Sequence, residues 1–224
     1  MMRFVDIKTL VPVCFSLTIT AACLFGSAGR LDWPNAWVLL GLSLAAGLAF
    51  TVVRDPDLAA ERRNVKAGKR WDKVLITITV LLGPMAVWIT AGLDDRFHWS
   101  NGMSFLVVTA GVSAALLAAA LTAWAMRSNR FFSSVVRIQK DRGHIVVDGG
   151  PYRFIRHPGY AGMSVFALVT PLILGSYWAL APAVATVSVI VVRTVLEDLT
   201  LQHDLDGYPD YARRVRFRLL PAIW

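Results

Sequence analysis

The stretch MSFLVVTAGVSAALLAAALTAWAM, residues 103–126, decides the fold class of this chain. It carries no charged side chain and is long enough to cross the hydrocarbon core of a bilayer as a single helix. Its many small residues would allow close approach of neighbouring helices in lipid: Gly111, Ser113, Ala114, Ala115, Ala118, Ala119 and Ala120. We therefore predict a membrane helix here.

The composition agrees with a membrane protein. Apolar residues make up 56% of the 224 residues, and the mean hydropathy is +0.54, above the range of soluble domains. The length suits one domain. We predict a single integral membrane domain over 1–224, with membrane helices in 1–126 and a catalytic and cofactor-binding part in 127–224.

Other apolar runs predict further membrane helices over 10–28, 36–53, 74–92, 160–174 and 177–195. The short links between the first two and the last two predict antiparallel hairpins. Pro84 predicts a kink in the third helix. We expect an all-α, polytopic membrane protein with about five to six membrane helices.

The net charge of +8 is concentrated between the apolar runs, chiefly in 54–73 and 127–158. Basic loops stay in the cytoplasm under the positive-inside rule, so both loops and both termini are predicted to be cytoplasmic. The charge therefore reflects membrane topology, and no nucleic-acid partner is expected. The tail, 193–218, is predicted to be an amphipathic cytoplasmic helix with an irregular end.

Several site classes are excluded by the sequence. Cys14 and Cys23 both lie in the first apolar run, so neither a disulfide framework nor a zinc cluster is expected, and we predict no metal. The chain lacks a P-loop, a GxSxG elbow, an HExxH helix and a GxGxxG fingerprint. Hydrolysis of nucleoside triphosphates and Rossmann-type binding are therefore disfavoured.

The segment GGPYRFIRHPGYAGM, residues 149–163, is the first candidate site. Gly149 and Gly150 permit positive φ, while Pro151 and Pro158 fix φ and restrict the residues before them. The chain must turn here, at the mouth of a membrane helix. The alternative is that its arginines and tyrosines only anchor the helix to lipid headgroups.

The segment RTVLEDLTLQHDLDGYPDY, residues 193–211, is the second candidate site. On a helix, Arg193 and Glu197 share a face as an i,i+4 pair, which is either a functional cluster or a capping ion pair. His203 is expected on the surface, and Tyr208 and Tyr211 are expected to pack at the interface. The following arginines are expected to bind anionic lipid headgroups: Arg213, Arg214, Arg216 and Arg218.

Both segments resemble the isoprenylcysteine carboxyl methyltransferase family. RHPGYAG at 156–162 is similar to the family's RHPxYxG, and the tail is similar to its R-T-x-x-E-E-x-x-L-x-H…Y-x-x-Y…V…L-P, over about 129–221 in all. The resemblance implies a membrane methyltransferase that uses S-adenosylmethionine, with a cytoplasmic cofactor pocket formed by the HPxYxG loop and the C-terminal segment. It also implies that a lipid substrate enters sideways from the bilayer. Asp198 departs from the pattern, since the family usually has glutamate there.

The resemblance also implies residue roles. The cofactor contacts would be Gly150, Pro151, Tyr152, His157, Pro158, Tyr160, Gly162, Glu197 and Asp198, and the catalytic residues Arg193, Glu197 and Arg214. A substrate carboxylate is ionised at neutral pH, so Arg193 or Arg214 need only hold it in place. An amine nucleophile would require a base, for which His157, Glu197 and Asp198 are the candidates.

Three alternatives remain open from the sequence. The first is an N- or S-methyltransferase of the same fold, acting on a phospholipid or a thiol. The second is an NADPH-dependent sterol-type reductase, which carries a similar HPxY segment but an acidic residue where this chain has Met163. The third is a non-catalytic membrane lipid-binding protein. The expected partners are a lipophilic small molecule or lipid as substrate, and membrane lipids.

Overall fold

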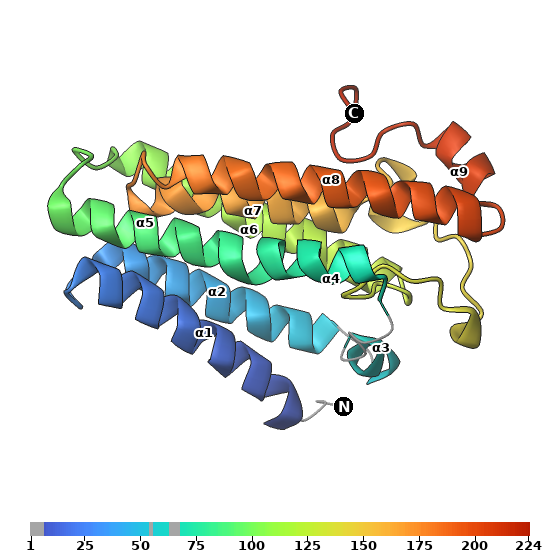
Figure 1. Ribbon diagram of the computed structural model, residues 1–224, viewed down its shortest axis with the longest axis horizontal. Coiled ribbons are helices and arrows are strands. Elements are labelled where there is room, and N and C mark those ends of the chain that lie inside the picture. Colours follow the sequence, from blue (N-terminus) through green and yellow to red (C-terminus); the bar gives the residue numbers. More distant parts are fainter. Residues whose placement is uncertain (1–6, 54–55, 63–67) are drawn as a thin grey trace.

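The computed structural model describes residues 7–53, 56–62 and 68–224. Its long helices run side by side along one axis (Figure 1). They are α1 (Ile7–Ala28), α2 (Pro34–Val53), α6 (Phe105–Ser128), α8 (Leu180–Asp204), and one helical course made of α4 (Arg70–Thr77), the π-helical turn η2 (Ile78–Leu82) and α5 (Gly83–Phe97). Within these described residues, five helices are thus long and apolar enough to cross a membrane, and α7 (Pro158–Leu174) is a shorter apolar helix. The predicted all-α, multi-pass membrane fold is confirmed.

The polar segments gather at one end of the helix bundle. Figure 1 shows α3 (Pro56–Glu61), the start of α4, α9 (Tyr208–Arg214) and the C-terminus there, and α1 also begins at this end. The short links between α1 and α2 and between α7 and α8 lie at the opposite end, as predicted for two hairpins. Residues 1–6, 54–55 and 63–67, which include part of the basic loop, lie outside the described residues.

The third helix is longer than predicted and contains a π-helical turn that ends at Leu82, two residues before Pro84. Proline lacks the N–H that a regular helix needs, and its ring clashes with the carbonyl four residues earlier. A π-helical turn is one way in which a helix absorbs such a disturbance. The adjacent Gly83 packs tightly on α8, because a Cβ atom there would lie 2.3 Å from Oγ1 of Thr186.

The helix predicted at the start of the tail is a continuation of the last apolar helix. Residues 193–204 are the last turns of α8, and only the short α9 follows. The sequence holds no glycine or proline between Arg193 and Asp204, so nothing breaks the helix where its apolar run ends. The chain turns instead at Gly207, whose φ is +81°.

Close packing of α6 on α7 places the site. A Cβ atom at Gly162 would lie 2.2 Å from Oγ1 of Thr122 and 2.8 Å from the carbonyl oxygen of Ala118. Ala115 and Ala118 on the predicted small-residue face are buried. The start of α7 is therefore held directly against α6, beside the loop that follows α6.

Candidate active site

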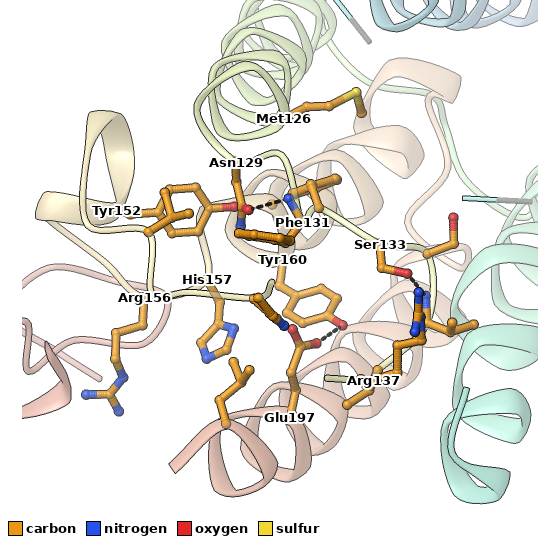
Figure 2. Close-up of a pocket in the computed structure, with 18 of the residues that line it drawn as sticks. Met126, Asn129, Phe131, Ser133, Arg137, Tyr152, Arg156, His157, Tyr160 and Glu197 are labelled. Atoms are coloured by element: carbon orange, nitrogen blue, oxygen red, sulfur yellow. Dashed lines mark hydrogen bonds between the residues drawn. The ribbon is translucent and has the colours of Figure 1, made fainter. Parts of the chain in front are cut away.

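A cavity of about 380 Å³ lies at the polar end of the bundle, between the loop after α6, the start of α7 and the last turns of α8. Five of the predicted site residues line it: Tyr152, His157, Tyr160, Arg193 and Glu197. Figure 2 shows His157, Tyr160 and Glu197 close together, with Tyr152 and Asn129 on the opposite wall. The two motifs, far apart in the sequence, thus meet in one cavity.

The HPxY segment forms the start of α7. Pro158 occupies the first position of the helix, where its missing N–H costs nothing, and His157 precedes it with φ −128°. The His157 ring stacks against the ring of Tyr160, with centroids 5.9 Å apart. The Tyr160 hydroxyl in turn donates to Oε2 of Glu197 at 2.5 Å. His157, Tyr160 and Glu197 therefore form a connected wall of the cavity.

Arg193 is buried and paired with Asp72 of α4. Its Nε donates to Oδ1 of Asp72 at 2.7 Å, and its Nη2 donates to the carbonyl oxygen of Ser134 at 2.8 Å. Its guanidinium also lies over the Tyr160 ring, 5.1 Å from the centroid. Of the two alternatives left open for Arg193 and Glu197, the ion pair between them is not formed among the described residues, because the carboxylate that pairs with Arg193 comes from another helix.

Asp198 lies fully buried behind the cavity and does not line it. Its two oxygens accept hydrogen bonds from Arg156, His157, Tyr208, Gln202 and Arg218. Burial raises the pKa of Tyr208, so its hydroxyl keeps its proton and donates to Asp198. The geometry therefore gives Asp198 a supporting place beneath the cavity, with its oxygens already occupied.

Arg156 and the two tail tyrosines belong to the same supporting network. Figure 2 shows the Arg156 side chain directed away from Tyr160 and Glu197. Its guanidinium bonds Asp198 and the carbonyl oxygens of Ala212, Val215 and Arg216. Tyr211, expected at the lipid interface, is instead buried and donates to the carbonyl oxygen of Tyr152. This network holds the C-terminal segment against the start of α7.

The other predicted site residues do not line the cavity: Gly150, Pro151, Pro158, Gly162 and Arg214. Gly150 has φ +58°, and a Cβ atom there would lie 2.2 Å from Oγ of Ser128, so it permits a turn against the end of α6. Arg214 is exposed and pairs with Asp148 at 3.1 Å. Of the two arginines proposed to hold a substrate, only Arg193 reaches the cavity.

The cavity also contains residues that the sequence did not single out. Asn129, Phe131, Arg137 and His144 line it from the loop after α6. Nδ1 of His144 accepts from the backbone N–H of Gln139, and its ring packs on Phe131 with centroids 4.4 Å apart. Burial lowers the pKa of His144 to about 4, so the ring is neutral near pH 7. A lone loop histidine carries no sequence signal of this kind.

The lowered pKa of His144 predicts acid sensitivity. The unfolded chain binds the proton with a pKa near 6.5, so stability is full above about pH 6.5 and falls as the pH drops towards 4. Because the His144 ring is partly exposed, we expect the free energy of unfolding to fall by roughly 1–2 kcal/mol between pH 7.5 and 5. Thermal unfolding at pH 7.5 and 5 checks this, with His144→Gln as the comparison, since glutamine keeps an acceptor. Equal pH dependence of the two proteins would contradict it.

The comparisons with known proteins agree with these motifs. The sequence model of the isoprenylcysteine carboxyl methyltransferase (ICMT) family matches residues 96–203, which include the HPxY segment and Arg193 to His203. The protein-S-isoprenylcysteine O-methyltransferase of Schizosaccharomyces pombe is 33% identical over 52 residues, 23% of this chain and 22% of the relative. A probable protein-S-isoprenylcysteine O-methyltransferase of Oryza sativa subsp. indica is 38% identical over 47 residues, 21% of this chain and 25% of the relative.

The fold also has a solved counterpart. The structure of the eukaryotic intramembrane Ras methyltransferase ICMT matches 99% of this chain and 88% of that chain, with a TM-score of 0.53 and 16% identity. At this identity the match shows the fold alone. The stretches matched in the curated relatives cover only about a quarter of their length or less. The resemblance to the isoprenylcysteine carboxyl methyltransferase family, predicted from the two motifs, is confirmed.

Proposed function

We propose that this chain, which resembles the isoprenylcysteine carboxyl methyltransferase family over residues 96–203, is a membrane-embedded methyltransferase that uses S-adenosylmethionine. The methyl acceptor is the carboxylate of a lipophilic, isoprenylcysteine-like molecule, the substrate named for the curated relatives. The observation that carries the proposal is the single cavity lined by His157, Tyr160, Arg193 and Glu197.

The residues of the cavity fit such a cofactor. Its volume of about 380 Å³ lies within the range of roughly 300–1,000 Å³ seen for small-molecule sites. Glu197 offers carboxylate oxygens to hydroxyl or ammonium groups, while Tyr152 and Phe131 offer aromatic faces. We assign cofactor binding to these residues with His157 and Tyr160, and we assign Gly150, Pro151, Pro158, Gly162 and Asp198 to shaping the loop around them.

We propose that the lipophilic substrate reaches the site through a neighbouring cavity. A second cavity of about 320 Å³ lies among the membrane helices and shares Phe50, Val80, Thr122 and Met163 with the first. Its remaining walls come mainly from α2, α5, α6, α7 and α8 and include the apolar side chains of Trp88 and Phe166, while α1 contributes the hydroxyl groups of Ser16 and Thr20. A lipid tail placed there would leave its polar end beside Arg193.

The chemistry follows from this placement. The cofactor supplies an electrophilic methyl group on a sulfonium, and the chain supplies position and electrostatics. A substrate carboxylate is already ionised, so it attacks without a general base. Arg193 orients it through charge-assisted hydrogen bonds. Glu197, which already accepts from the Tyr160 hydroxyl, is better placed to bind the cofactor than to remove a proton. This favours a carboxylate over an amine acceptor.

We also propose the orientation of the protein in its membrane. The end of the bundle that carries the cavity also carries Arg62, Lys69, Arg137 and the arginines of α9. The positive-inside rule places that end, with both termini, in the cytoplasm. The loop after α6, the last turns of α8 and the short α9 then present the catalytic part of 127–224 to the cytosol, and membrane lipids surround the long apolar helices.

Binding of S-adenosylhomocysteine to the purified protein tests the cofactor assignment. Isothermal titration calorimetry is expected to show saturable binding that NADPH does not displace. Displacement by NADPH would favour the reductase alternative. No heat of binding up to about 1 mM ligand, which corresponds to less than about 4 kcal/mol of affinity, would contradict the proposal and favour a lipid-binding protein.

A further inference from the structure

Asp72 is a buried carboxylate outside both motifs and outside the stretch matched by the family. It is the third residue of α4, near the end of the basic segment 54–73, and its exposed fraction is 0%. A carboxylate in the first turn of a helix is favoured by the helix dipole, but one so deeply buried needs a strong partner. The hydrogen bonds of Asp72 therefore indicate its role in the site.

Both oxygens of Asp72 are occupied. Oδ1 accepts from Nε of Arg193 at 2.7 Å, and Oδ2 accepts from the backbone N–H of Val136 at 2.6 Å and from Nη2 of Arg193 at 3.3 Å. The backbone of the same segment is paired too, since the N–H of Lys69 donates to the carbonyl oxygen of Val136. One side chain thus joins α4, the loop after α6, and α8.

The guanidinium of Arg193 is oriented by these bonds. Its Nε and Nη2 face Asp72 and the carbonyl oxygen of Ser134, and one face of its plane lies over Tyr160. Among the described residues, its Nη1 makes no hydrogen bond, and Arg193 lines the cavity. Because a guanidinium is a rigid planar fork, fixing two of its nitrogens fixes the direction of the third.

We propose that Asp72 is a positioning residue for methyl transfer, which holds Arg193 so that Nη1 points at the substrate carboxylate. This inference rests on the proposed function. Asp72 also balances the charge of the buried Arg193, so the arginine acts as an aligned donor. The role differs from that of a stabilising ion pair, because it predicts a loss of turnover that depends on Arg193.

The test is a double-mutant cycle on the full-length protein, with Asp72→Asn, Arg193→Lys and the two combined. We expect Asp72→Asn to lower kcat/KM for the acceptor about 100-fold, as misplacement by about 1 Å does. Its KM for S-adenosylmethionine and its affinity for S-adenosylhomocysteine should stay within about twofold of wild type. A lysine ammonium has no planar group for Asp72 to orient. The kcat/KM of the combined variant should therefore equal that of Arg193→Lys within about twofold.

Asp94→Asn is the matched control. Asp94 is an equally buried carboxylate at the opposite end of the bundle, where it accepts from Ser100 and Ser176. This variant is expected to lose stability but to keep kcat/KM per mole of cofactor-binding sites. Three results would overturn the inference about Asp72 without touching the proposed function. The first is that the effects of Asp72→Asn and Arg193→Lys on kcat/KM multiply in the combined variant, and the second is near-wild-type turnover of Asp72→Asn. The third is a loss of turnover that is fully explained by a loss of cofactor-binding sites. Absence of methyl transfer by the wild type would overturn the proposed function with it.

Discussion

Arg193→Gln is expected to lower kcat/KM for methyl transfer by about 10³-fold, because the cavity then loses the charged donor that faces the acceptor. The change also leaves the Asp72 carboxylate buried without its arginine, which by itself destabilises a protein by about 3–5 kcal/mol. A loss of activity alone would therefore be ambiguous.

The double variant Asp72→Asn/Arg193→Gln removes that ambiguity, because it leaves no unpaired charge. We expect it to unfold near the wild-type temperature and to bind S-adenosylhomocysteine, yet to remain inactive. Transfer is measured with a tritiated methyl group and normalised to calorimetric binding sites. Activity of this variant within about tenfold of wild type would show that Arg193 does not hold the acceptor.

Asp198→Asn is expected to have the largest effect on the structure. The carboxylate binds two arginines, His157, Gln202 and Tyr208, and an amide carries one oxygen in place of two and no charge. Breaking such a buried network costs about 3–5 kcal/mol. We also expect cofactor binding to be lost, because Asp198 holds His157 and the C-terminal segment in place.

Unfolding in detergent and calorimetry with S-adenosylhomocysteine measure these two effects of Asp198→Asn. His203→Gln serves as the comparison, since its side chain is 89% exposed and bonds only Asp204 among the described residues. Wild-type stability together with wild-type cofactor affinity for Asp198→Asn would contradict the supporting place assigned to Asp198.

The membrane fold could be predicted from the sequence because apolar runs of bilayer length have few other structures open to them. The positions at which the helices end could not be predicted in this way. Composition changes from apolar to polar near Val195, but α8 continues to Asp204, since its inward side chains find partners on other segments. Glu197 bonds Tyr160, Asp198 bonds Arg156, and Thr200 bonds Lys69.

The candidate site was predicted in part. The motifs identified Tyr152, His157, Tyr160, Arg193 and Glu197, which line one cavity. Asp72 was missed because its partner Arg193 is 121 residues away, and sequence spacing points only to the local i,i+4 neighbour. Spacing also does not separate Glu197, which faces the cavity, from Asp198, which faces the supporting network one residue later.

The most direct test of the account is transfer of a tritiated methyl group from S-adenosylmethionine to N-acetyl-S-farnesylcysteine by the purified protein. We expect the label to enter the lipid extract and to be released by mild base as volatile methanol, since a methyl ester hydrolyses under those conditions. Arg193→Gln should release about 10³-fold less label. Label that resists base would indicate an amine or thiol acceptor, and no incorporation by the wild type would contradict methylation of an isoprenylcysteine-like carboxylate.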